Sequence, residues 1–111
     1  MNVYDTVNKL AEELKQSEEY KNFKEAKETI NLMPECKIKI SEFEKLRYEE
    51  QLNSIQTGNS DKKKLEEIQE LYKQLIEVPE VKKYFDAELK FNILLGDVNK
   101  IISEAVREVM T

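Results

Sequence analysis

Three stretches of this chain carry the same helix-start signal, and this repetition constrains the fold more than any other feature. Each stretch places a serine or proline ahead of a glutamate and then a lysine, at residues 17–21, 34–37 and 79–82. Proline at the first helical position and an acidic residue in the first turn both favour a helix start. Apolar residues at helical spacing follow each signal, so the chain is predicted to consist of helices joined by abrupt corners.

The composition supports an all-α fold. The chain has 111 residues with only two glycines and two prolines, too few for an all-β fold with many turns. Apolar residues make up 40% and charged residues 37%, which suits one modest core in a single domain covering residues 1–111. We predict an open up-and-down bundle of four to five helices with a long C-terminal helix, assembled as an oligomer.

Apolar spacing locates the individual helices. Helices are expected at residues 3–16, from Ser17 to about 33, from Pro34 to just before Thr57, from a cap at Asn59 or Ser60 to 76, and at 79–110. The apolar residues of the third helix are Cys36, Ile40, Phe43 and Leu46, followed by Leu52 and Ile55.

The last helix is too long for a chain of this size to cover by itself. At about 1.5 Å per residue, residues 79–110 span roughly 48 Å, and apolar residues recur along their whole length. Part of this apolar stripe is expected to be exposed in a monomer. A partner is therefore predicted, most economically a second copy of the chain.

A polar seam beside that stripe marks the predicted interface. Gly96 costs a helix roughly 1 kcal/mol relative to alanine, which suggests a packing reason. One interpretation is close approach of another helix, with Asn99 fixing the register as buried asparagines do in coiled coils. The other is an exposed polar seam with a tolerated glycine. The predicted interface residues are Phe91, Leu95, Gly96, Asn99 and Ile102.

The residue inventory argues against catalysis. The chain has no histidine, which excludes a Ser-His-Asp or Cys-His arrangement and any zinc site that contains histidine. Its single cysteine, Cys36, cannot form an internal disulfide. Cys36 is either a reactive thiol near a helix start or, as we favour, a small apolar residue on the buried face. We predict no catalytic, cofactor-binding or metal-binding residue, and no enzymatic activity.

Two clusters of charged residues, one acidic and one basic, are typical of the solvent-exposed surface of a helix. Glu66, Glu67 and Glu70 lie close together, but a carboxylate-bridged metal pair would normally add histidine ligands, so pairing with Lys63 and Lys73 is expected instead. The basic run at residues 62–64 could touch RNA, although such a run is more often a solvated helix start.

The overall charge and hydropathy limit the partners. The net charge of −5 is spread over both halves of the chain, which disfavours direct nucleic-acid binding by a broad basic face. No apolar run approaches the roughly 18 residues of a membrane span, and no signal-peptide pattern begins the chain. These features lead us to expect a cytoplasmic protein without a membrane partner.

Several short motifs follow one another in a characteristic order and spacing over nearly the whole chain. They are residues 3–5, 10–11, 17–21, 26–27, 34–35, 69–72, 79–82 and 87–88, and above all Leu94-Leu95-x-Asp97-Val98-Asn99-Lys100-Ile101. Together these motifs resemble the YheA-like branch of the YlbF/YmcA family of Gram-positive bacteria.

The resemblance implies an all-α protein that dimerises or assembles further. It also implies a non-enzymatic regulator: relatives act in competence, sporulation and biofilm formation, some in a complex that adjusts an mRNA-cleaving endonuclease. Iron–sulfur binding through several cysteines, linked to some relatives, does not carry over to a chain with Cys36 alone. The expected function is that of a regulatory or adaptor protein working through helix-mediated contacts. The alternative is an RNA-associated factor within an RNA-processing complex.

Overall fold

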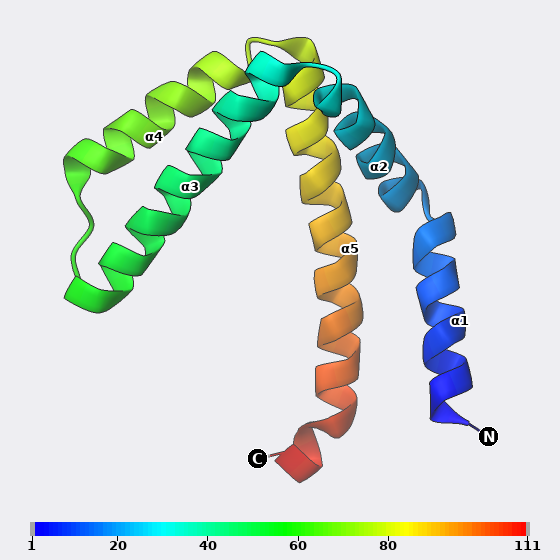
Figure 1. Ribbon diagram of the computed structural model, residues 1–111. Helices are drawn as coiled ribbons and strands as arrows, with labels where there is room; N and C mark the ends of the chain where they lie inside the picture. Colours follow the sequence, from blue (N-terminus) through cyan, green and yellow to red (C-terminus); the bar gives the residue numbers. More distant parts are fainter. Residues whose placement is uncertain (1, 111) are drawn as a thin grey trace. The chain divides into compact units, whose positions relative to one another are not determined.

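The structure, a computed structural model, describes residues 2–110 and contains five helices (Figure 1). No strand occurs within these residues. The all-α prediction and the long C-terminal helix are both confirmed. The helices are α1 (Val3–Gln16), α2 (Glu18–Asn31), α3 (Pro34–Thr57), α4 (Lys62–Leu75) and α5 (Pro79–Met110).

Ser17 forms the corner between α1 and α2. Its hydroxyl donates to the carbonyl oxygen of Leu14 at 2.6 Å, and its Oγ accepts from the backbone N–H of Tyr20 at 3.1 Å. One side chain thus satisfies a terminal carbonyl of the first helix and a terminal N–H of the second. This confirms Ser17 as the predicted cap of α2.

The two prolines begin α3 and α5, as predicted. Pro34 is the first residue of α3 and Pro79 the first residue of α5. The second helix ends at Asn31, two residues before the predicted end at Met33. Met33 has φ −123° and ψ 78°, because the ring of a following proline disfavours the helical conformation in the residue before it.

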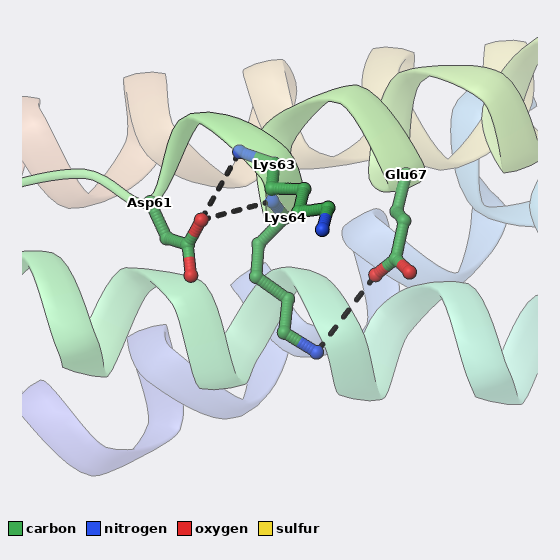
Figure 2. Close-up of polar contacts among 4 residues, drawn as sticks. All are labelled: Asp61, Lys63, Lys64 and Glu67. Atoms are coloured by element: carbon green, nitrogen blue, oxygen red, sulfur yellow. Dashed lines mark hydrogen bonds and ion pairs between the residues drawn. The ribbon is translucent and has the colours of Figure 1, made fainter.

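The cap of α4 differs from the prediction. Neither Asn59 nor Ser60 caps this helix. Instead, Oδ1 of Asp61 accepts from the backbone N–H groups of Lys63 at 3.0 Å and Lys64 at 3.3 Å (Figure 2). Asn59 belongs to the turn that follows α3, since its N–H donates to Thr57 Oγ1 at 3.2 Å. The turn begins at Gly58, whose φ of +75° suits glycine.

The chain divides into two compact units, one of residues 28–83 and one of residues 1–27 with 84–111. In the first, α3 and α4 form an antiparallel hairpin (Figure 1). The Phe43 and Tyr72 rings meet at a centroid distance of 5.6 Å, and the Arg47 guanidinium lies 5.3 Å from the Phe43 centroid. Other buried apolar side chains in this unit are Ile30, Ile40, Ile68, Leu75 and Val81.

In the other unit, the packing is aromatic and joins α2 to the first half of α5. Phe23 lies 5.7 Å from Tyr84 and 5.9 Å from Phe91, measured between ring centroids, and Tyr20 meets Phe91 edge-on at 5.9 Å. Such tilted and edge-on contacts are preferred ring geometries. They cover one face of α5 as far as Phe91.

Candidate protein–protein interface

The apolar face of α5 continues well beyond the aromatic contacts. From Phe91 onward, apolar residues alternate at spacings of four and three, the pattern of a coiled-coil seam. The series spans about 27 Å along the helix axis and consists of Phe91, Leu95, Val98, Ile102, Ala105 and Val109. We call this series the α5 seam.

Most of the α5 seam has no covering helix within the described residues. Val98 is half-buried, but Leu95 is 36% exposed, Ile102 51% and Val109 85%. Ile101 and Val106, which flank the seam, are exposed as well. Isolated exposed apolar residues are ordinary, but a continuous exposed stripe along one helix face is typical of a site that another helix covers.

The predicted interface residues fall into two groups. Phe91 packs within the chain, against Tyr20 and Phe23. Leu95, Gly96, Asn99 and Ile102 are all exposed and follow Phe91 on α5. At about 100° per residue, Asn99 lies about 40° from Leu95, whereas Gly96 lies about 100° from Leu95 and about 120° from Ile102. Of the predicted set, the half-buried Phe91 therefore packs partly within the chain, whereas the other four are exposed.

Gly96 is open in this chain. A Cβ atom built at Gly96 meets no atom within 4 Å. No close helix approach at Gly96 therefore comes from the described residues of the same chain. If its small size serves close packing, a second molecule must supply the other helix.

The first helix, α1, belongs to the same compact unit as the exposed half of α5 and also has exposed apolar side chains. None of its side chains is buried. Leu10 and Leu14 are half-buried, whereas Val3, Tyr4 and Val7 are exposed. The apolar side chains of α1 are therefore uncovered in its N-terminal half and partly covered in its C-terminal half.

The charged clusters behave as helix surface. Lys64 Nζ lies 3.8 Å from Glu67 Oε2, an i,i+3 pair (Figure 2), rather than the pairing through Lys63 and Lys73 that we expected. Gln74 donates to Glu70 Oε1 at 3.5 Å. Across residues 2–110, no group of three or more acidic or cysteine side chains is arranged to hold a metal ion.

Cys36 is a half-buried free thiol. It lies on the face of α3 that also carries the buried Ile40 and Phe43, in step with the apolar interpretation. None of the described helices has a segment long and apolar enough to cross a membrane.

Comparison with known proteins identifies the family. The model of the family described as "Control of competence regulator ComK, YlbF/YmcA" matches residues 3–107. The chain belongs to the YlbF/YmcA family. A UPF0342 protein of Symbiobacterium thermophilum is 38% identical over 104 residues, covering 94% of this chain and 93% of that protein.

Relatives in other bacteria are similar over the same length. A UPF0342 protein of Caldicellulosiruptor saccharolyticus is 34% identical, covering 95% of this chain and 88% of the relative. A UPF0342 protein of Clostridium novyi is 33% identical, covering 96% of this chain and 93% of the relative. The YlbF/YmcA resemblance noted from short motifs is therefore confirmed over nearly the whole chain.

Proposed function

We propose that this member of the YlbF/YmcA family is a non-enzymatic regulatory or adaptor protein of the cytoplasm that acts through helix-to-helix contacts. The observation that carries the proposal is the exposed half of the α5 seam, which has coiled-coil spacing and no covering helix in the described residues. The family description, which refers to control of a competence regulator, supports a regulatory role.

The occupant proposed for the α5 seam is a second copy of the chain. Leu95 and Ile102 supply apolar contacts at seam positions. Gly96 is turned about 100° around the helix from Leu95, so a close backbone approach at its open position would lie at the edge of the seam. Asn99 adjoins these residues and can fix the register by pairing with a polar group of the partner. The resulting dimer would present a combined surface to a further protein, as adaptors do.

A matched set of substitutions tests the surface. Ile102→Glu and Leu95→Glu each place a charge in the seam, so we expect both variants to sediment at a lower mass than the unsubstituted protein at tens of micromolar. Ile93→Glu is the control, because Ile93 is 55% exposed but lies on the opposite side of α5 at about 100° per residue. Equal masses for all four proteins would contradict the proposal.

A pull-down experiment distinguishes an adaptor that acts through protein contacts from an RNA-associated factor. A protein partner retained at high salt by the unsubstituted chain, and lost with Ile102→Glu but kept with Ile93→Glu, supports the adaptor function. Steep salt-dependent RNA binding by the pure protein, unaffected by Ile102→Glu, would instead favour an RNA-associated factor.

A further inference from the structure

The first helix, α1, has the same apolar spacing as the α5 seam. Its two valines and two leucines are four, three and four positions apart, and they are Val3, Val7, Leu10 and Leu14. We call these four residues the α1 seam. The α5 seam shows the same alternation of four and three. Two apolar series of this kind can interlock side by side, as the seams of a coiled coil do.

Ring contacts of α2 with α5 set the direction and the register of the chain along α5. Tyr20 meets Phe91, whereas Phe23, later in α2, meets Tyr84, earlier in α5. The two helices therefore run antiparallel. Facing residues in an antiparallel pair have a constant sum of residue numbers. Tyr20 with Phe91 gives 111, and the two contacts of Phe23 lie on either side of that value.

This register, continued past the corner at Ser17, aligns the α1 seam with the α5 seam. Every member of the α1 seam finds an apolar counterpart at a sum of 112, within one residue of the register in α2. The pairs are Leu14 with Val98, Leu10 with Ile102, Val7 with Ala105, and Val3 with Val109. Because the register comes from rings in α2, it is independent of the spacing within α1.

The exposure of the two seams rises together with distance from Ser17. At the near end, Leu14 and Val98 are both half-buried. At the far end, Val3 is 72% exposed and Val109 is 85% exposed. Residues that the register pairs are thus also similar in burial. This pattern is expected of two helices that are close at one end and splay apart toward the other.

We infer that α1 is a strap that closes over the α5 seam of its own chain and so competes with a second copy for that surface. The structure describes the open state, in which only the pair nearest Ser17 is partly covered. Ser17 is the one residue between α1 and α2, so a backbone change at this corner moves α1 as a unit. Closure removes the exposed end of the α5 seam from water.

This regulation rests on the proposed function, because closure and dimerisation use the same face of α5. Only the open form can pair with a second copy. The apparent dissociation constant of the dimer therefore exceeds the intrinsic one by the inverse square of the open fraction, and an open fraction of about one half raises it about fourfold. Weakening closure should tighten the dimer, whereas a charge in the α5 seam should weaken it.

A charge in the α1 seam tests the competition. Val7→Glu opposes closure and leaves α5 unchanged, so we expect its dimer dissociation constant, measured by sedimentation, to lie about fourfold or more below that of the control. The control is Asn8→Glu, which adds the same charge at an adjacent exposed position turned about 100° around α1. Equal or weaker dimerisation of Val7→Glu would contradict the competition.

Disulfide trapping tests the register of the closed state. In a Cys36→Ala background, Val7→Cys is combined with Ala105→Cys, and mild oxidation should link the two thiols within one molecule. The control pair combines Ala105→Cys with Lys9→Cys, which lies about 160° around α1 from Val7 and should link several times more slowly. The oxidised Val7 and Ala105 variant should sediment as a monomer, and reduction should restore the dimer.

Three results of the trapping experiment would overturn the strap: equal rates for the two pairs, links formed mainly between molecules, or an oxidised protein that still dimerises. Failure of the proposed function looks different. If the chain does not pair through the α5 seam, Ile102→Glu and the unsubstituted protein have equal masses, and the regulation by α1 fails with it. If the seam pairs but α1 does not close, Ile102→Glu still lowers the mass, whereas Val7→Glu behaves like Asn8→Glu.

Discussion

Glu50 Oε1 in α3 accepts a hydrogen bond from the backbone N–H of Asp61 at 2.8 Å, across the turn that leads into α4. Glu50 is only 7% exposed. Asp61 in turn caps α4 through the N–H groups of Lys63 and Lys64. Two carboxylates therefore stabilise the α3–α4 turn. The Glu50 carboxylate binds the backbone of Asp61, and the Asp61 carboxylate caps α4. The bond to a charged acceptor offsets part of the cost of burying Glu50.

Replacing Glu50 should weaken the α3–α4 hairpin. Glu50→Ala removes a charge-assisted hydrogen bond and leaves the Asp61 N–H without its acceptor, so we expect the free energy of unfolding to fall by about 1.5–3 kcal/mol. Glu50→Gln keeps a carbonyl acceptor and should cost less. Urea titration followed by circular dichroism measures both changes. The neighbouring exposed Glu49 provides the control, and a Glu49→Ala loss as large as that of Glu50→Ala would contradict the role assigned to Glu50.

Asp61 should be the only sensitive capping position in the turn. Asp61→Ala is expected to lower stability by about 0.5–2 kcal/mol, the usual cost of losing a side-chain N-cap, whereas Asp61→Ser keeps an acceptor and should be milder. Asn59→Ala and Ser60→Ala change the two residues that sequence alone favoured as caps and should have little effect. The unfolding midpoints of the four variants decide the matter, and a larger loss at Asn59 or Ser60 would refute the assignment.

The helix boundaries could be predicted because their signals are local. Ser17, Pro34 and Pro79 act on the few residues beside them, so the sequence contains what their placement requires. The cap of α4 was mispredicted because three residues with capping side chains, Asn59, Ser60 and Asp61, follow one another. What selects Asp61 is its bond to Glu50, eleven residues earlier, which is a tertiary contact.

The exposed surfaces were harder to anticipate than the helices. Leu52 and Ile55 were named in one apolar series with Phe43, but both are exposed, whereas Phe43 is buried and meets Tyr72 of α4. The packing of Phe91 against Tyr20 and Phe23 was likewise missed, because periodicity shows that a face is apolar and not which helix covers it. The exposed end of the α5 seam was correctly expected from the length of the helix together with the apolar residues that recur along it.

The aromatic cluster should dominate the stability of the unit formed by residues 1–27 and 84–111. Phe23 touches both Tyr84 and Phe91, so Phe23→Ala removes two ring contacts, and we expect a loss of about 2–4 kcal/mol, near the usual range for a large core truncation. Leu32→Ala, at an exposed position, should change stability by less than about 0.5 kcal/mol. Thermal melts compare the two. Similar melting temperatures for both variants would show that the cluster contributes little.

The two glycines should respond to alanine in opposite directions. Gly58 has φ +75°, where a side chain is strained, so Gly58→Ala should destabilise the fold by about 1–2 kcal/mol. Gly96 is in a regular helix with no atom within 4 Å of a built Cβ. In the Ile102→Glu background, where the α5 seam is disabled, Gly96→Ala should therefore stabilise the chain by about 0.5–1 kcal/mol.

The larger substitution at Gly96 distinguishes close packing by a second chain from a merely exposed seam. With Ile102 intact, a leucine side chain would fill the space that a partner helix needs, so Gly96→Leu should lower the sedimenting mass, or cost the assembly about 1–3 kcal/mol through overpacking. Melts and solution masses of the alanine and leucine variants, each with and without Ile102→Glu, separate the helix effect from the interface effect. Stabilisation by both substitutions with an unchanged mass would mean that no helix packs against Gly96, and the proposed contact would then have to rest on Leu95 and Ile102 alone.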